Sequence, residues 1–337
     1  MTICGIIMYM KIRVISDLHL DVNDKFPFSI KQEDRDVFTL IAGDVSGNVK
    51  LTARWVKENI NNGMFIVGNH DPAYNDIGWT IKNQKLYLHN KFNVQGSNVT
   101  YLDESVGVMS KEIPNTNILV VGTTLYTDYR YISEGDKKWF DKRNEALKKD
   151  GEPEIDIGVM NRSSGERRLN DFRWGKVEDE IEFGKQRYLR AKDYEKWFNS
   201  SFQKIKEIIE ANPDKDIIVL THHCPTPKCI SGEYVNSNLN SSYVSDLEDF
   251  IKSHTNIKAW CCGHVHSVTI DKVGETLIVC NPRGYERNFE SDKWNPNTFI
   301  DTDKWEVVTE EWEVPPKLAK KRKEHQSHIN DYLAWFI

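Results

Sequence analysis

Five short segments of the chain are rich in residues that bind metal ions through nitrogen or oxygen. In order along the sequence they are Asp17-Leu18-His19, Gly43-Asp44, Gly68-Asn69-His70-Asp71, Thr221-His222-His223 and Gly263-His264-Val265-His266. A set that mixes imidazole, carboxylate and amide groups suits Mn, Fe or Zn better than an all-oxygen magnesium site or an all-sulfur structural zinc site. Two such ions roughly 3.5–4 Å apart can clamp a phosphoryl group and activate a water molecule. The segments therefore predict a two-metal site suited to phosphoester hydrolysis.

Each segment follows a short apolar run of strand length. The runs are Lys11–Ile15, Val37–Ala42, Gly63–Val67, Asp216–Leu220 and Ile257–Cys261. They are partly β-branched and predict buried strands. In an open α/β sheet the carboxyl ends of the strands carry the chemistry, so we expect the segments to meet at one edge. Apolar residues at helical spacing over 49–60, 198–209 and 244–251 predict helices that cover the sheet.

The order of the five segments resembles the calcineurin-like metallophosphoesterase superfamily, whose pattern is D-x-H, G-D, G-N-H-D/E, H and G-H-x-H. The resemblance spans residues 11–301. It implies an α/β fold, a four-layer α/β/β/α sandwich with the ligands on loops at the carboxyl ends of the strands. It also implies two divalent metal ions, with Mn²⁺ favoured and Fe or Zn as alternatives, and a metal-bridging hydroxide as the nucleophile.

The resemblance further implies a role for each motif residue. The implied metal ligands are Asp17, His19 and His266 for the first ion, Asn69, His222 and His264 for the second, and Asp44 as the bridge between them. The catalytic residue His70 would face the phosphate, where it would stabilise the transition state or protonate the leaving oxygen.

Two neighbours of these residues leave alternatives open. His223 could bind metal in place of His222; the superfamily pattern favours His222, and His223 would then support the site or contact substrate. Asp71 is placed with the catalytic residues because it could orient His70. It could instead cap the following turn, since Pro72 directly after it forces an extended or turn geometry.

Two further segments resemble a bacterial and phage subgroup of the superfamily. The run Gly122–Asp128 is similar to its G-x-T-L-W-T-D element, and Asn281–Tyr285, Asn-Pro-Arg-Gly-Tyr, to its C-terminal signature. Arg283 in that signature could hold a substrate phosphate bidentately or be a structural turn residue. The arginines that bind substrate phosphate in the Ser/Thr protein phosphatases have no counterpart beside Asp44 or before Gly68. This difference argues against a protein phosphatase.

The segment from residue 129 to 193 has many charges and aromatic residues but few aliphatic ones. It predicts a charged, mostly helical insertion that could cover the metal site as a lid. Within it, Asn170-Asp171-Phe172 resembles the N-D-Y/F element of the subgroup. The candidate contacts to substrate phosphate are Arg168 and Arg173, with Arg162 and Arg167 as further candidates; a solvated helical surface is the alternative.

Composition fits one elaborated globular domain over residues 11–301, followed by an extension over residues 302–337. Hydrophobic residues make up 39% and charged residues 28% of the chain, as in globular proteins. The net charge of −6 gives no sign of a general nucleic-acid surface. Six cysteines without C-x-x-C spacing predict buried free thiols in a reducing compartment.

The two ends of the chain suggest where the protein acts and with what. The N-terminal residues show no convincing signal or membrane span, so we expect a cytoplasmic protein without a membrane partner. The extension combines a basic run over 317–323 with an apolar end over 333–337. We expect this tail to support a homo-oligomer or to pack on the insertion, with a phosphate-rich partner as the alternative.

These observations favour a binuclear metal phosphodiesterase that acts on a nucleotide or another small phosphoester. A nuclease on DNA or RNA and a phosphomonoesterase are the alternatives; the acidic balance weakens the nuclease, which needs an extended basic groove. A non-enzymatic interaction module, known in the superfamily where ligands are lost, fits least because the ligand set is intact.

Overall fold

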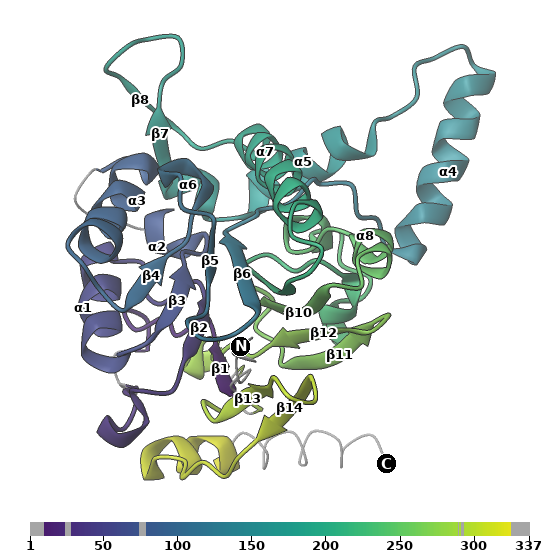
Figure 1. The fold of residues 1–337 in the computed structure, drawn as a ribbon. Helices are drawn as coiled ribbons and strands as arrows, with labels where there is room; N and C mark the ends of the chain where they lie inside the picture. Colours follow the sequence, from purple (N-terminus) through teal and green to yellow (C-terminus); the bar gives the residue numbers. More distant parts are fainter. Residues whose placement is uncertain (1–9, 24–27, 74–78, 289, 291–292, 325–337) are drawn as a thin grey trace.

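Two six-stranded sheets form the centre of the molecule (Figure 1). The computed structural model describes residues 10–23, 28–73, 79–288, 290 and 293–324. The first sheet has the order β14 (Glu306–Thr309), β13 (Thr298–Asp301), β1 (Lys11–Ile15), β2 (Thr39–Ala42), β3 (Gly63–Ile66) and β4 (Val99–Tyr101). The second has the order β11 (Thr269–Val273), β12 (Thr276–Cys280), β10 (Ile257–Cys262), β9 (Asp216–Thr221), β6 (Ile118–Thr123) and β5 (Ser110–Glu112).

The central strands of both sheets run parallel. In the first sheet β1, β2, β3 and β4 pair in parallel, whereas β13 and β14 add antiparallel strands at one edge. In the second sheet β6, β9, β10 and β12 pair in parallel between the antiparallel edge strands β5 and β11. Parallel strands present their carboxyl ends at the same edge, and this arrangement sets the position of the predicted ligands.

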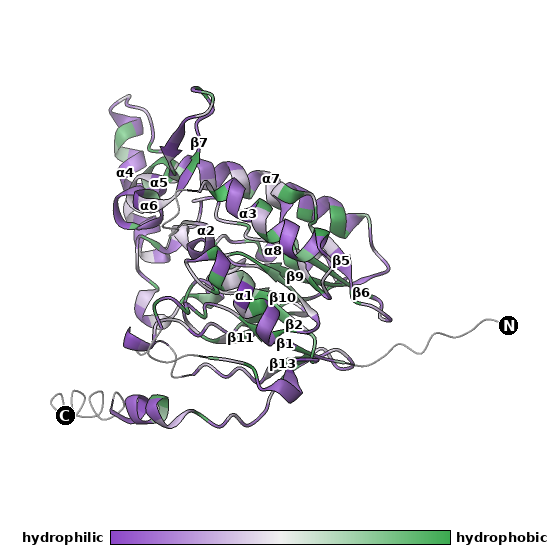
Figure 2. Cartoon of the chain, turned by 90° about the vertical axis from the view of Figure 1, so that its left-hand side faces the viewer, coloured by the Kyte–Doolittle hydropathy of each residue, from purple (hydrophilic) through white to green (hydrophobic). Residues whose placement is uncertain are grey.

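The two sheets pack face to face and helices cover their outer faces. The alternation along β9 shows this: Ile218 and Leu220 face the first sheet, whereas Ile217 and Val219 face the covering helices. Such strands are buried on both faces, and Figure 2 accordingly shows the inner strands as largely apolar. The helices α1 (Val49–Asn59) and α3 (Ile81–His89) lie outside the first sheet, and α7 (Ala191–Glu210) and α8 (Glu248–Ser253) outside the second (Figure 1). The predicted four-layer sandwich is confirmed.

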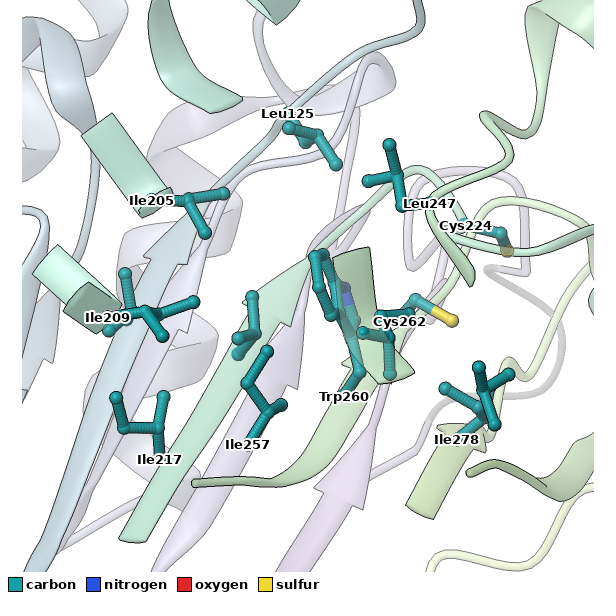
Figure 3. Packing of buried hydrophobic residues seen from close by; sticks show 14 of the residues in the cluster. Leu125, Ile205, Ile209, Ile217, Cys224, Leu247, Ile257, Trp260, Cys262 and Ile278 are labelled. Atoms are coloured by element: carbon teal, nitrogen blue, oxygen red, sulfur yellow. The ribbon is translucent and has the colours of Figure 1, made fainter. Parts of the chain in front are cut away.

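Most predicted elements agree with the structure, but the helix predicted over residues 244–251 does not. Helix α8 begins only at Glu248. Cys224 N donates to Tyr243 O at 3.1 Å and Ser245 N donates to Cys224 O at 3.0 Å. The backbone before α8 is therefore extended beside Cys224. Val244 forms an isolated β-bridge with Cys224 and packs in the core that Figure 3 shows.

The insertion contains three helices and a hairpin. These are α4 (Glu134–Lys149), α5 (Ile157–Arg168), α6 (Asp171–Trp174), β7 (Lys176–Glu178) and β8 (Gln186–Tyr188). Helix α4 has no buried residue and projects from the body of the molecule (Figure 1). In contrast, α6 contacts α2 (His70–Ala73), which belongs to a predicted metal-binding segment. One end of the insertion thus reaches the site.

Short helical turns complete the loops. They are the 3₁₀ turns η1 (Gln32–Asp34), η3 (Glu104–Val106), η4 (Pro227–Cys229), η5 (Gly232–Tyr234), η6 (Asn240–Ser242) and η7 (Glu286–Asn288), and the π-helical turn η2 (Asn90–Val94). None of the helices in the described part of the chain is long and apolar enough to cross a lipid bilayer.

The C-terminal extension begins inside the first sheet. Strand β14 pairs with β13, so the predicted boundary at residue 301 falls between two strands of one sheet. A helical segment over 316–324 then packs on the domain: Leu318 is buried, and the Arg322 guanidinium lies 5.4 Å from the ring centroid of Trp312. The apolar end over 333–337 lies outside the described residues.

We expect one buried ion pair to contribute strongly to stability. Lys85 Nζ on α3 lies 2.8 Å from Asp103 Oδ2, and both side chains are almost fully buried. Burial alone would lower the pKa of Lys85, but Asp103 raises it above its ordinary value. Lys85→Met leaves an uncompensated buried carboxylate and should lower the free energy of unfolding by about 3–5 kcal/mol in urea denaturation.

The matched control is Lys82→Met on the same helix. Lys82 Nζ lies 3.3 Å from Glu178 Oε2, but both groups are exposed. The change in unfolding free energy should stay below about 1 kcal/mol. If both variants lost the same amount of unfolding free energy, burial would not be the reason that the Lys85–Asp103 pair stabilises the protein.

Candidate metal centre

The five predicted segments lie side by side in loops that follow β1, β2, β3, β9 and β10. Backbone hydrogen bonds join these loops: Asp17 N donates to Gly43 O at 3.0 Å, and Gly263 N donates to His222 O at 2.9 Å. Across the two sheets, His264 N lies 3.1 Å from both carboxylate oxygens of Asp17. The parallel topology therefore brings together segments that are more than 200 residues apart in the sequence.

The backbone at this edge is strained. Five of the predicted ligands have positive φ: Asp17 (52°), His19 (43°), Asp44 (53°), His264 (69°) and His266 (51°). Residues with a Cβ rarely adopt this conformation, which costs of order 1–3 kcal/mol each and clusters at functional sites. The strain turns these side chains toward a common centre.

Two motif glycines make room for the predicted carboxylate ligands. A Cβ on Gly68 would lie 2.0 Å from Asp44 Oδ1, and a Cβ on Gly263 would lie 2.4 Å from Asp17 Oδ2. Both distances are far below van der Waals contact. The glycines of G-N-H and G-H-x-H are thus required because each carboxylate packs directly on the neighbouring backbone.

Asp17, His19 and His266 form the first group of candidate ligands. His19 Nε2 lies 2.9 Å from His266 Nε2, and Asp17 Oδ1 lies 3.4 Å from His266 Nε2 and 3.8 Å from His19 Nε2. Ligands at about 2.0–2.1 Å from one ion stand roughly 3 Å or a little more apart. The spacing of this group therefore suits a single cation.

Asp44, His222 and His264 form the second group, with Asn69 beside it. The ligand atoms of the first three lie within 4.8 Å of one another. His222 Nε2 is 3.3 Å from Asp44 Oδ2 and 3.0 Å from Asn69 Oδ1. The structure thus places His222 in this group, as the superfamily pattern favours. His223 is fully buried, with its ring centroid 4.2 Å from that of His264.

Asp44 lies between the two groups. Its Oδ2 atom is 4.0 Å from His19 Nε2 in the first group as well as 3.3 Å from His222 Nε2 in the second. Burial opposes ionisation of Asp44, but the surrounding imidazoles, His222 foremost, hold the pKa of this carboxyl well below its ordinary value. An ionised carboxylate at this point is suited to bridge two cations.

The hydrogen bonds and protonation of the candidate ligands fit the binding of cations. His264 Nε2 is buried and has no hydrogen-bond partner among the described residues, and buried Asp44 Oδ2 has only the approach of His222 Nε2 at 3.3 Å. Burying such groups without a partner costs free energy, and a cation would satisfy both. Burial, together with the neighbouring imidazoles, also lowers the pKa of His19 and His264 well below the ordinary value. Both rings are therefore neutral, the form that binds metal.

Two of the candidate imidazole ligands are oriented by a contact that their Nδ1 atom makes. His222 Nδ1 lies 2.7 Å from Ala42 O, and His266 Nδ1 lies 2.6 Å from Glu290 Oε2. Such contacts fix which ring nitrogen is free for a metal. No sequence motif pointed to Glu290, because this residue lies in a loop outside the five segments.

Asp171 links the insertion to the second group. Asn69 Nδ2 donates to Asp171 Oδ2 at 3.0 Å, and the Tyr194 hydroxyl donates to the same oxygen at 3.2 Å. The first contact turns Asn69 Oδ1 toward His222. From the sequence we compared Asn170-Asp171-Phe172 with the N-D-Y/F element of the subgroup but predicted no role for Asp171. That element was the sequence feature that could have identified Asp171 as a site residue.

Asp71, which we predicted to be a catalytic residue, is hydrogen-bonded to the backbone of two loops. Its carboxylate accepts hydrogen bonds from the backbone N–H groups of Asp44 (2.7 Å), Ser46 (3.2 Å) and Gly68 (2.9 Å), and from the Thr52 hydroxyl (2.9 Å). It is buried and fastens the loop after β2 to the loop after β3. Asp71 therefore positions Asp44 through its backbone, and its orientation of His70 stays a prediction.

His70 lies at the opening of the site. Its backbone N–H donates to Asp44 Oδ1 at 2.9 Å, and its Nε2 atom is 3.5 Å from the hydroxyl of Tyr285. The Tyr285 ring packs on His19, with centroids 4.5 Å apart. His70 and Tyr285 thus stand together beside both ligand groups, which is the position expected for groups that contact substrate.

A cavity of about 430 Å³ opens over the centre. Its metal-site wall contains Asn69, His70, His264 and His266, and its outer wall comes from the insertion and from residues 230–243. Among the predicted arginines Arg168 lines this cavity, and it donates to Asn238 Oδ1 at 2.8 Å.

The other candidate arginines lie elsewhere. Arg162 pairs with Glu195 at 2.6 Å, Arg167 contacts Ser163 and Arg173 is exposed beside Asn170. None of the three lines the cavity.

Arg283 is buried away from the cavity. Its Nε atom donates to Glu286 Oε1 at 3.1 Å, and its guanidinium lies 5.5 Å from the ring centroid of Trp294. Only 2% of the residue is exposed. This geometry fits the structural alternative for Arg283 rather than a phosphate contact, because packing of the C-terminal loops encloses the side chain.

Removal of the Asp171 carboxylate should weaken metal binding. Asp171→Ala frees Asn69 to rotate, so we expect one of two Mn²⁺ ions to bind about 10–100-fold more weakly in calorimetry. Asp171→Asn keeps an oxygen acceptor and should lose less. Arg173→Ala, on the same helix but exposed, is the control. Unchanged affinity in Asp171→Ala would contradict a positioning role for this residue.

Comparison with known proteins agrees with this geometry. A family model described as calcineurin-like phosphoesterase matches residues 10–268. Comparison with curated protein sequences gives no match. Among solved structures, the phosphopantetheinyl hydrolase of Mycobacterium tuberculosis is similar with a TM-score of 0.62 at 14% identity, over 91% of this chain and 99% of that chain.

A Staphylococcus aureus protein assigned provisionally as a 5′-nucleotidase gives a TM-score of 0.43 at 13% identity, over 95% of this chain and 58% of that chain. The mycobacterial likeness supports the fold alone, and the staphylococcal one is too distant to carry an argument. The family model spans most of the chain and includes all five ligand segments. The chain belongs to the calcineurin-like phosphoesterase family of phosphoester hydrolases.

Proposed function

We propose that this protein is a two-metal phosphodiesterase that acts on a nucleotide or a similar small phosphoester. The observation that carries the proposal is the position of Asp44 between two groups of candidate ligands. Asn69, His264 and His266 of these groups line a cavity of about 430 Å³. Two cations in these groups would supply Lewis acidity toward the phosphoryl oxygens and lower the pKa of a water molecule. Manganese is the proposed metal, because the donor set mixes imidazole with oxygen ligands.

The residues of the chain would bind and orient the phosphoester. Asp44 would contribute a ligand to both cations, and Asp71 holds Asp44 through its backbone. His70 Nε2 is placed to donate a proton to the leaving oxygen, with Tyr285 as its neighbour 3.5 Å away. Arg168 is placed to contact a phosphate or its substituent from the outer wall of the cavity.

The shape of the cavity supports a small substrate with an organic group. Its volume falls in the range of small-ligand sites, roughly 300–1,000 Å³. Tyr234 and Tyr243 offer flat apolar surfaces, and Ser231 and Asn240 offer hydrogen-bonding groups. These groups suit the base or sugar of a nucleotide. A nuclease is less well supported, because the chain has a net charge of −6.

Hydrolysis of two chromogenic substrates tests the proposal. Metal-stripped protein is assayed on bis-p-nitrophenyl phosphate and p-nitrophenyl phosphate with Mn²⁺, Zn²⁺, Mg²⁺ or no metal. Both substrates have the same leaving group, so their ratio reports diester against monoester preference. We expect Mn²⁺-dependent hydrolysis that favours the diester. Asp44→Asn should lower kcat/KM by more than the roughly 10–100-fold typical of supporting residues, because it removes the central negative charge.

The control for this assay is Asp179→Asn, a half-buried residue of the β7–β8 hairpin that belongs to neither ligand group and does not line the cavity. It should behave as the unmodified protein does. Preference for the monoester would replace the phosphodiesterase with a phosphatase. Absence of bound metal at saturating concentrations would overturn the two-metal site itself.

Replacement of Arg168 should affect KM for a substrate that fills the cavity more than KM for a small chromogenic substrate. Arg168→Ala is expected to raise KM about tenfold for a dinucleotide or cyclic nucleotide that fills the cavity, the loss of one hydrogen bond to a charged group. KM for p-nitrophenyl phosphate should change less. Arg167→Ala is the matched control, since Arg167 neighbours Arg168 on α5 but does not line the cavity. Equal changes for both substrates would exclude a substrate contact by Arg168.

A further inference from the structure

Four cysteines meet behind the second ligand group. Cys224 follows β9, Cys229 ends the turn η4, and Cys262 and Cys280 end β10 and β12. All four are free and buried. The sulfur atoms of Cys224, Cys229 and Cys262 lie within 4.8 Å of one another, and those of Cys229 and Cys262 are 3.9 Å apart.

The fourth sulfur, that of Cys280, is adjacent to this group. Cys224 Sγ lies 3.1 Å and Cys280 Sγ 3.6 Å from the same carbonyl oxygen, Gly263 O. Cys262 and Cys280 are also paired residues on neighbouring strands. The four thiols thus come from three parallel strand ends and one turn. They belong to the apolar cluster in which Figure 3 labels Cys224 and Cys262.

We propose that Cys224, Cys229, Cys262 and Cys280 form a separate metal site in which their four thiolates bind a zinc ion. A tetrahedral zinc site with Zn–S bonds of about 2.3 Å separates its sulfur atoms by roughly 3.8 Å. The 3.9 Å between Cys229 and Cys262 fits this separation, and a movement of about 1 Å or less brings the three within it. Thiolate ligands select zinc over manganese, whereas the mixed Asp and His centre suits manganese.

The position of this thiolate site indicates what it does. Cys224 lies two residues after His222, and Cys262 lies two residues before His264. Cys229 leads directly into Ile230 and Ser231, which line the cavity. A zinc ion would therefore tie the ends of β9 and β10 to the cavity wall and hold the second ligand group in place.

A cobalt-loaded form of the full-length protein tests the proposal. Because the four cysteines are buried, the metal is supplied during expression, with cobalt replacing zinc in the medium. Thiolate ligands give an intense near-ultraviolet sulfur-to-cobalt charge-transfer band, which the Asp and His centre cannot produce because it contains no sulfur. X-ray absorption of the zinc form should show Zn–S distances of about 2.3 Å.

Serine variants assign the signal to the cluster. The double variant Cys229→Ser/Cys262→Ser, which leaves two of the four thiols, should lose most of the charge-transfer band and one bound metal ion per chain, with a lower melting temperature. Cys261→Ser is the matched control: Cys261 is equally buried and adjacent to Cys262, but it faces the other core between the sheets. It should keep the band and the ion.

Three results would overturn the proposal. One is cobalt-containing wild-type protein without a charge-transfer band, which requires no variant to fold. Another is a band that persists at full intensity in the double variant Cys229→Ser/Cys262→Ser. The third is a disulfide between any two of the four cysteines, detected by mass spectrometry after alkylation of the unreduced protein. None of these results depends on phosphoester hydrolysis, so the two proposals fail separately.

Discussion

The buried carboxylate of Asp44 is the group on which the rest of the site depends. It stands where the loops of two sheets meet, with His19 from one side at 4.0 Å and His222 from the other at 3.3 Å. A negative charge in such a place is costly unless cations and hydrogen-bond donors surround it. The imidazoles hold its pKa low, and the His70 N–H donates to it. The arrangement fits the proposed pair of cations.

Strained loops hold this centre in shape, and packing offsets their cost. Five candidate ligands have positive φ, at of order 1–3 kcal/mol each. Asp71 fastens two of these loops through their backbone, and the apolar layer between the sheets fixes the strands from which they leave. The insertion adds Asp171, which orients Asn69. Hydrogen bonds and packing thus hold the candidate ligands in place. The outer wall of the cavity contains Arg168, which belongs to the insertion.

Local sequence patterns predicted the strands well and one helix poorly, for a physical reason. Apolar runs such as Asp216–Leu220 have no other stable place than a buried strand, and β9 follows that run closely. Residues 244–251 have helical spacing, yet the backbone of Tyr243 and Ser245 bonds to Cys224, so the helix starts at Glu248. A pairing with a residue about twenty positions away overrode the local pattern, and periodicity cannot detect such a pairing.

The sequence by itself predicted the family through the order of its motifs, the types of ligand through the motif residues, and the strands through local apolar runs. The two-sheet fold followed from the resemblance to the family. The tertiary structure decided which side chains meet. It placed Glu290 on His266, enclosed Arg283 against Glu286, and brought together cysteines whose spacing follows no metal-binding pattern. These contacts join segments distant in the chain. They are set by the register of the strands and the packing of the sheets, which no single stretch of sequence encodes.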